Sequence, residues 1–174
     1  LLEVLLFRCF EQNFPIGLNV RISDQMGAED GLRLKFWGVR GSIACPGPNT
    51  VRYGGNTSCV EVRCGQDLLI LDAGTGLREL AESVKQEKSL KANLFLTHTH
   101  LDHAGALSLL QEHWDVPTYM PAADRPLFET LPHQGTMFGM PHLDRPCGRI
   151  DHEVVDGDTV LLGEMTLRFL STPG

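Results

Sequence analysis

The chain has 174 residues, a length that suits one domain with a hydrophobic core of its own. Hydrophobic residues make up 42% of it, and no apolar run is long enough to span a bilayer, which excludes a transmembrane helix. The net charge of −7 and the scattered basic residues count against nucleic acid as a partner. A bound divalent metal would reverse the local sign, so a nucleic-acid substrate stays open.

The cysteines are odd in number and form no CxxC pair; they are Cys9, Cys45, Cys59, Cys64 and Cys147. Both features argue against a disulfide framework or a zinc ribbon. We therefore expect reduced, mostly structural thiols and a cytoplasmic protein.

The first 30 residues show no sustained hydrophobic period and end in the polar stretch 23–30. One interpretation is a leader or extension, with Met26 as the natural start; the other is an extra edge strand packed on the domain. The apolar opening, residues 1–7, lacks a basic region and a cleavage site, so it is not interpreted as a secretory signal. The domain itself is expected to span residues 31–174.

From Leu32 onward the pattern is regular. Apolar and basic residues alternate over 32–36, which predicts a half-buried strand, and the Gly/Pro-rich stretch 38–56 predicts a loop. Residues 59–62 and 68–71 flank a turn and predict a hairpin. Apolar residues at helical spacing from Leu77 to Val84 predict a helix.

Two strand–loop–helix units are expected next. The first combines a strand ending at Leu96 with a short helix over 104–110, and the second a strand near 118–120 with a helix over 125–131. Residues 132–149, rich in proline and glycine, are expected to be irregular. Three strands follow, at residues 153–155, 159–162 and 166–170. This order predicts a mixed sheet with helices on its outer face, as a single α/β layer or a sandwich.

The strongest chemical signal is residues 98–103, His-Thr-His-Leu-Asp-His, directly after the apolar strand that ends at Leu96. Histidines at positions i and i+2 of an extended segment point to the same side, so His98 and His100 can bind one cation. Asp102 and His103 can complete that site or face a second cation. Imidazole and carboxylate suit zinc, iron and manganese alike, so ligand types leave the metal open.

Asp72, at the end of an apolar strand, is the next candidate. It can orient the histidine loop through hydrogen bonds, or it can serve as a cap or turn residue before Leu77. Arg40, Asn56 and Thr57 in the Gly/Pro loop are further candidates for reaching the site. The remaining histidines are expected at the surface or in local hydrogen bonds, namely His113, His133, His142 and His152.

Residues 98–103 resemble the HxHxDH signature of the metallo-β-lactamase-fold hydrolases, and Asp72 stands where that superfamily carries its first-motif aspartate. The resemblance covers about Leu32 to Gly174. It implies an α/β fold, the metallo-β-lactamase αββα sandwich, present here as its N-terminal portion and truncated before the family's later ligands. Half a sandwich would expose an apolar sheet face, which predicts self-association.

Two groups within the superfamily are matched by different stretches. Phosphodiesterase- and ribonuclease-Z-like members resemble residues 36–42 (Phe-Trp-Gly-Val-Arg-Gly-Ser), 52–58 (Arg-Tyr-Gly-Gly-Asn-Thr-Ser) and 71–76 (Leu-Asp-Ala-Gly-Thr-Gly). Members like glyoxalase II resemble residues 134–139 (Gln-Gly-Thr-Met-Phe-Gly), 156–158 (Asp-Gly-Asp) and 172–174 (Thr-Pro-Gly), the last of which precedes a metal-binding histidine in that group.

The resemblance implies a metal-dependent hydrolase that uses a metal-bound hydroxide, with two zinc ions in the intact protein and iron or manganese as alternatives. His98 and His100 would bind one metal, and Asp102 and His103 the second; Asp102 would also orient the attacking water, while Asp72 would support the loop. We expect a small-molecule substrate, a thioester first and a phosphodiester or another ester next. A non-catalytic metal-binding fragment is the alternative from another class.

Overall fold

The computed structural model describes residues 2–4, 17–23, 33–45, 47–50, 54–87, 90–137, 139, 147–163 and 165–172. The expectations for Met26, His142 and the terminal residues 173–174 lie outside these ranges. Within them, no helix is both long and apolar enough to cross a bilayer.

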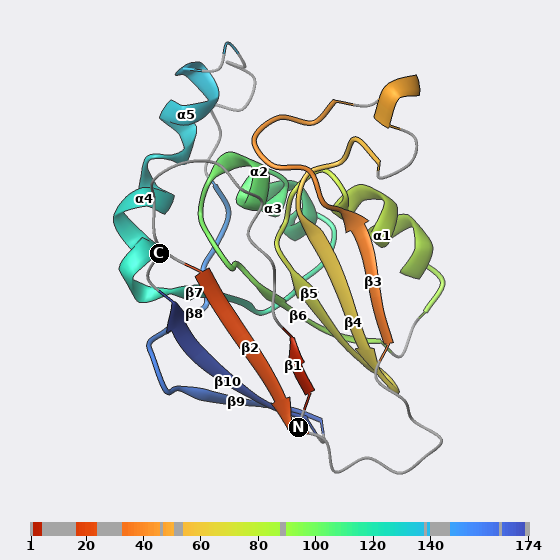
Figure 1. Ribbon diagram of the computed structural model, residues 1–174, viewed down its shortest axis with the longest axis vertical. Coiled ribbons are helices and arrows are strands. Elements are labelled where there is room, and N and C mark those ends of the chain that lie inside the picture. Colours follow the sequence, from red (N-terminus) through yellow and green to blue (C-terminus); the bar gives the residue numbers. More distant parts are fainter. Residues whose placement is uncertain are drawn as a thin grey trace.

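The described chain forms two β-sheets that lie face to face (Figure 1). The larger sheet has the order β3-β4-β5-β6-β7-β8, with bounds Arg33–Gly38, Cys59–Cys64, Asp67–Leu71, Lys91–Phe95, Thr118–Pro121 and His152–Val154. The smaller sheet has the order β1-β2-β10-β9, with bounds Leu2–Val4, Gly17–Ser23, Met165–Thr172 and Thr159–Leu162. One chain segment, 152–162, therefore passes from the first sheet to the second.

The larger sheet is mixed, as the sequence predicts. The strands β3, β4 and β5 pair antiparallel, and β5 to β8 pair parallel. The expected hairpin is confirmed, because β4 and β5 pair from Val60 with Leu71 to Cys64 with Asp67. Because β5, β6 and β7 are parallel neighbours, their C-terminal ends lie at the same end of the sheet. In open α/β sheets, ligands bind at this end.

Helices cover the face of the larger sheet that is turned away from the smaller one. They are α1 (Leu77–Val84), α2 (Leu101–Ala104), α3 (Leu107–Gln111), α4 (Arg125–Glu129) and α5 (Leu131–Met137). Two 3-10 turns, at Pro48–Thr50 and Ala122–Asp124, lie in the loops. The helix α1 buries Leu77, Leu80 and Val84, which share one face at a spacing of three and four residues.

Alternation along β5 builds a core on each side of the sheet. Leu68 and Ile70 pack with the helices, whereas Leu69 and Leu71 pack with residues of the smaller sheet such as Phe169. Both faces of this strand are buried, which explains its unbroken apolar run. The layers are therefore helix, sheet and sheet, in agreement with the metallo-β-lactamase sandwich expected from the sequence.

Two helix boundaries differ from the prediction. The expected helix over 104–110 is two helices, because the N–H of Ala106 donates to the carbonyl of Ala73 (2.8 Å) instead of continuing one ladder. Residues 131–137, expected in part to be irregular, form α5. Pro132 stands in its first turn, where a missing N–H removes no helical hydrogen bond.

Candidate functional site

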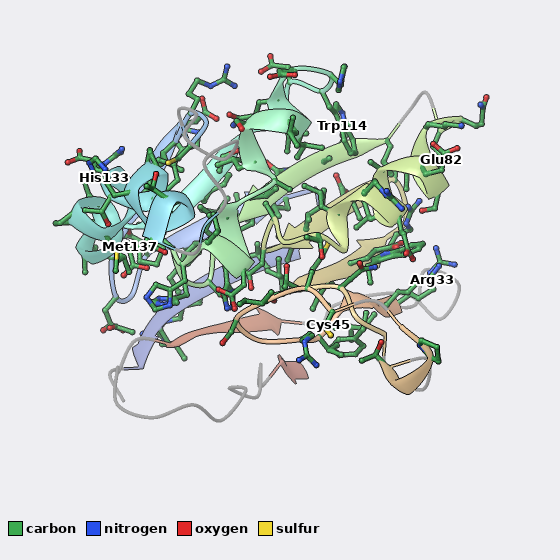
Figure 2. All side chains as sticks on the ribbon, turned by 90° about the horizontal axis from the view of Figure 1, so that it is seen from above. Arg33, Cys45, Glu82, Trp114, His133 and Met137 are labelled. Atoms are coloured by element: carbon green, nitrogen blue, oxygen red, sulfur yellow. The ribbon has the colours of Figure 1, made fainter. Side chains whose placement is uncertain are left out.

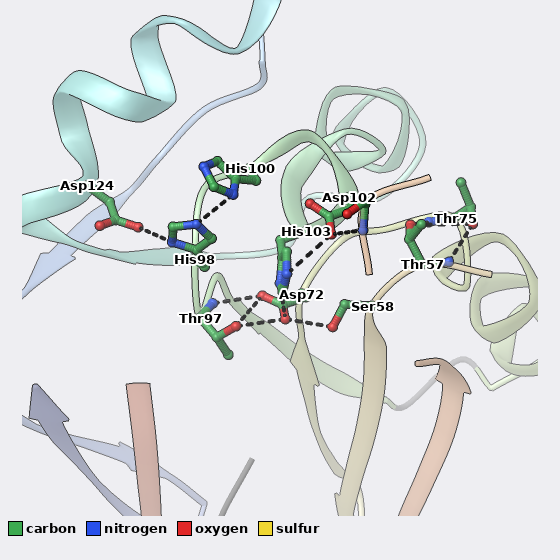
Figure 3. A network of polar contacts seen from close by, with 11 residues as sticks. Thr57, Ser58, Asp72, Thr75, Thr97, His98, His100, Asp102, His103 and Asp124 are labelled. Carbon is green, nitrogen blue, oxygen red and sulfur yellow. Dashed lines mark hydrogen bonds and ion pairs between the residues drawn. The ribbon is translucent and has the colours of Figure 1, made fainter. Parts of the chain in front are cut away.

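Three polar segments meet at the C-terminal ends of the parallel strands of the larger sheet (Figure 3). Asp72 follows β5, residues 97–103 follow β6, and Asp124 ends the 3-10 turn that follows β7. Because these strands are parallel neighbours, side chains that are far apart in sequence come within contact distance. The histidine stretch is thus flanked by two buried carboxylates, of which the sequence indicated only Asp72.

Asp72 connects three parts of the site. It is 3% exposed and adopts a left-handed backbone (φ 67°), which short polar residues tolerate better than most. Its Oδ1 accepts from the N–H (2.8 Å) and hydroxyl (2.9 Å) of Thr97. Its Oδ2 accepts from the hydroxyl of Ser58 and from Nδ1 of His103, both at 2.8 Å. The side chain makes no cap hydrogen bond to α1, whose N-cap is Gly76.

His103 is strongly affected by this carboxylate. Burial alone would lower its pKa, but the charge of Asp72 and the hydrogen bond to it, with the charges of Asp102 and Asp124, raise the pKa to about 9. Because Nδ1 faces Asp72, Nε2 of the ring is turned toward Asp102, whose Oδ2 lies 3.6 Å away. The pair His103–Asp102 therefore presents one nitrogen and one oxygen to the same space.

His98 and His100 form a second pair. Nε2 of His98 lies 2.9 Å from Nδ1 of His100, and the ring centroids are 4.1 Å apart. Burial, followed by the neighbouring His98, lowers the pKa of His100, so its neutral form, with a free lone pair, is favoured near neutral pH. The rings of His98 and His103 lie 5.7 Å apart between centroids, which places the two pairs side by side.

The loop 39–45 closes one side of the site. The backbone N–H of Ser42, whose φ is 65°, donates to Oδ2 of Asp102 (2.7 Å). Arg40 turns its guanidinium back onto the carbonyl of Ile43 (2.8 Å), and Asn56 donates to Glu79 (3.0 Å). Arg40 and Asn56 thus hold the loop and its base. Thr57 exchanges hydrogen bonds with Thr75: its N–H donates to the Thr75 hydroxyl (2.9 Å), and its hydroxyl accepts from the Thr75 N–H (2.8 Å).

Asp124 is the site residue that sequence reasoning missed. It is 1% exposed, and its Oδ2 lies 3.5 Å from Nδ1 of His98. Its Oδ2 also accepts from the hydroxyl of Thr99 (3.3 Å). The sequence offered one signal for Asp124, a polar residue shortly after the strand β7. Ala-Ala-Asp is also an ordinary way to start a helix, so this signal did not distinguish a site residue.

The other histidines in the described ranges stand apart from this cluster. His113, His133 and His152 are exposed, as expected. Figure 2 shows His133 and Met137 together on α5, and Met137 is 84% exposed. Among the described residues, no three His, Cys, Asp or Glu side chains gather closely enough to hold a metal ion together. The roles proposed for residues 98–103 and Asp72 therefore stay predictions, supported by two adjacent donor pairs.

Comparison with known proteins adds independent evidence. Hydroxyacylglutathione hydrolase GloC of Haemophilus influenzae is 39% identical over 77 residues, which cover 43% of this chain and 36% of that protein. The metallo-beta-lactamase fold protein YhfI of Bacillus subtilis superposes with a TM-score of 0.57 at 20% identity, over 83% of this chain and 56% of that one. TTHA1623, solved in a di-iron-bound form, gives a TM-score of 0.50 at 26% identity, over 62% and 52%.

The chain spans about half the length of the curated relatives that it matches over its longest stretches. The likeness to YhfI shows the fold, and the two sheets and outer helices described above agree with it. A family model described as "Metallo-beta-lactamase superfamily" matches residues 52–174, a segment that includes Asp72 and the whole histidine stretch. The chain therefore belongs to the metallo-beta-lactamase superfamily.

Proposed function

We propose that this chain carries residues of a divalent-metal centre in a hydrolase that attacks carbonyl or phosphoryl groups, with a thioester as the preferred substrate. Members of this superfamily are typically hydrolytic metalloenzymes. Membership therefore supports a metal-dependent hydrolase in general. The observation that carries it is the approach of Nε2 of His98 to Nδ1 of His100, at 2.9 Å.

The donor pairs fit a metal by distance. Zinc–nitrogen bonds of about 2.0–2.1 Å put two nitrogens on one cation roughly 2.9–3.4 Å apart, for angles between about 90° and 110°. The His98–His100 separation of 2.9 Å lies at the lower end of this range. Nε2 of His103 lies 3.6 Å from Oδ2 of Asp102, and this nitrogen and oxygen would hold the second cation. Two donors in each pair leave coordination positions for water and substrate.

Each candidate site residue has a distinct part in this proposal. His98 and His100 would hold one cation, and Asp102 and His103 the second. A bound divalent cation lowers the pKa of coordinated water toward neutrality and polarises the substrate oxygen. Asp102, held by the N–H of Ser42, would orient the attacking water, while Asp72 fixes the ring of His103. No serine or cysteine nucleophile is required.

The thioester preference is supported by the names of two similar proteins. GloC is named a hydroxyacylglutathione hydrolase, and so is a Nitrosomonas europaea protein that is 30% identical over 111 residues. A phosphodiester is the runner-up, because residues 36–42, which resemble phosphodiesterase-like members, contact Asp102 through the N–H of Ser42. Zinc is the proposed metal, and iron is the main alternative, since TTHA1623 was solved with two iron ions.

The test combines cation binding with turnover. The chain is loaded with zinc, iron or manganese and assayed on S-lactoylglutathione and on bis(p-nitrophenyl) phosphate. Zinc binding with thioester hydrolysis, both lost on His98→Ala and His100→Ala and kept on the exposed His113→Ala, is the expected result. Turnover of the phosphodiester alone would replace the thioester assignment. Metal binding without turnover of either would favour the non-catalytic metal-binding fragment.

Location and self-association stay proposals as well. The described cysteines, namely Cys45, Cys59, Cys64 and Cys147, are free thiols, which suits the proposed cytoplasmic location; cell fractionation tests it. Leu161 on β9 is 74% exposed and Val155 is 57% exposed, on the segment that links the sheets. Light scattering across a concentration series tests the proposed homo-oligomer.

A further inference from the structure

Asp124 is a buried carboxylate with fewer hydrogen-bond partners in the described structure than a buried acid usually has. Its side chain is 1% exposed, and its Oδ1 is a buried atom with no hydrogen-bond partner among the described residues. Buried acids are normally paired or fully hydrogen-bonded, because burial strips the charge of its water. An interaction that offsets the cost of burying this carboxylate is therefore expected.

Two common structural explanations do not account for it. Asp124 is the N-cap of α4, but its side chain makes no cap hydrogen bond. The adjacent Arg125 does not neutralise it either, because that guanidinium pairs with Glu153 through Nε (2.6 Å) and Nη2 (2.5 Å). Nδ1 of His98 lies 3.5 Å from Oδ2 of Asp124, and the charge of Asp124 also acts on His100 and His103.

The two side chains leave complementary atoms unsatisfied. Nδ1 of His98 is buried without a hydrogen-bond partner and lies 3.5 Å from Oδ2 of Asp124. A neutral imidazole carries hydrogen on one ring nitrogen. Hydrogen on Nε2 would turn the lone pair of Nδ1 against a buried carboxylate. Hydrogen on Nδ1 instead points an N–H at that carboxylate and leaves the lone pair on Nε2, which is the atom that approaches His100.

The same arrangement already exists on the other side of the site. Nδ1 of His103 lies 2.8 Å from Oδ2 of Asp72, and its Nε2 is turned toward Asp102. In both cases a buried carboxylate that follows a neighbouring strand faces Nδ1, and Nε2 is turned to the other member of the pair, His100 or Asp102 (Figure 3). Carboxylates that accept the second N–H of a metal-binding histidine fix the ring and raise its basicity.

We propose that Asp124 is a positioning residue for His98, which selects the Nδ1–H form of the ring and thereby directs the lone pair of Nε2 toward a cation. The inference rests on the metal centre proposed above, but its first test does not require metal. Asp124 acts through His98 and has no contact with the substrate in this scheme.

The first measurement is the hydrogen position on His98 in the metal-free, ¹⁵N-labelled chain, from long-range ¹H–¹⁵N correlation spectra. We expect hydrogen on Nδ1 and a free lone pair on Nε2 in the wild type. In Asp124→Ala the Nε2–H form should gain population, because the acceptor is gone. A wild-type ring that carries hydrogen on Nε2, alone or together with Nδ1, overturns the proposal.

The second measurement is zinc affinity, by competition with a chromophoric chelator. Removing such a carboxylate typically weakens metal binding by about 10–100-fold, and we expect a loss of that order for Asp124→Ala. Asp124→Asn, whose amide oxygen still accepts, should lose less. The matched control is Asp151→Asn, which changes a carboxylate that accepts from Thr118 at the start of β7, whereas His98 follows the end of the parallel strand β6; its affinity should equal the wild type's. A folded Asp124→Ala that binds zinc as the wild type does contradicts the proposal.

The two measurements separate this inference from the proposed function. Failure of the wild type to bind any of the three metals removes the metal centre, whereas the hydrogen position on His98 still decides the role of Asp124. If Asp124→Ala does not fold, as circular dichroism would reveal, Asp124→Asn and the wild-type spectrum decide it.

Discussion

Asp72 accepts hydrogen bonds from three residues, Ser58, Thr97 and His103, with its two carboxylate oxygens, so its loss should affect more than one contact. Asp72→Ala would leave the N–H of Thr97 and the hydroxyl of Ser58 without their acceptor in a buried place. Removing one partner of a buried charged network typically costs about 3–5 kcal/mol. We expect a loss of that order in the free energy of unfolding, measured by urea denaturation with chelator present.

The matched control for Asp72 is a carboxylate at the surface. Asp115, whose side chain is 89% exposed, pairs with Arg149, and exposed pairs contribute little. Asp115→Ala should change the unfolding free energy by less than about 1 kcal/mol. An equal effect of both substitutions would contradict the supporting role assigned to Asp72.

His103 makes the stability of the metal-free chain depend on pH. The pKa of His103 is about 9 in the folded chain, against an ordinary histidine value of 6.5, so the folded state holds the proton more tightly. The stabilisation is complete below about pH 6.5 and is lost as pH rises through about 9. Its size is at most about 3 kcal/mol. Unfolding free energies with chelator should therefore fall across this window in the wild type.

His103→Gln is the comparison for this pH dependence, because glutamine keeps a polar group there and does not titrate. The difference in unfolding free energy between wild type and variant should shrink from about pH 6 to about pH 9. Parallel curves over that window would show that another group causes the dependence.

At the scale of elements, the loop after β5 and the start of α2 pack so closely that they need glycine. A Cβ on Gly74 would lie 2.3 Å from the carbonyl oxygen of Asp102 and 2.6 Å from that of Ser58. Both are backbone atoms that cannot move alone, so Gly74→Ala should push α2, with Asp102 and His103, away from β5. Overpacking of this kind typically costs about 1–3 kcal/mol, readable by thermal or urea unfolding.

Gly47 supplies the control for this substitution. A Cβ added there would meet no atom within 4 Å, so Gly47→Ala should leave stability close to the wild type's. Zinc affinity offers a second measurement, since a displaced Asp102 should weaken binding in Gly74→Ala alone. Equal behaviour of the two variants would contradict the tight contact between these elements.

Across the whole molecule, the smaller sheet contributes a core layer. Phe169 on β10 is 1% exposed, and its ring centroid lies 5.4 Å from that of Phe95 on β6. Phe169→Ala should cost about 3–5 kcal/mol in unfolding free energy, because it opens a cavity between the sheets. Leu161→Ala, at a 74% exposed position of the same sheet, should cost less than about 0.5 kcal/mol. A small loss for Phe169 would argue against face-to-face packing of the sheets.

Much of this architecture could be predicted because its signals are local. The alternation at residues 68–71, the spacing of Leu77, Leu80 and Val84, and the dense run of ligands at 98–103 can each be recognised within a few neighbouring positions. Family resemblance then supplied the sandwich. The exact ends of short helices were less accessible, since the break before Ala106 depends on a hydrogen bond to Ala73, a residue of another strand's loop.

By itself, the sequence determined the elements, the apolar faces and the candidate ligands, because hydrophobic period and side-chain chemistry act over short distances along the chain. Tertiary structure alone decided which carboxylates face which histidines. Asp124 and His98 are separated by a helix pair and a strand, and only the parallel pairing of β6 with β7 brings them to 3.5 Å. The same holds for Asp72 and His103, which follow the neighbouring strands β5 and β6. Which residues meet at the ends of neighbouring strands depends on strand order, and no local sequence pattern encodes that order.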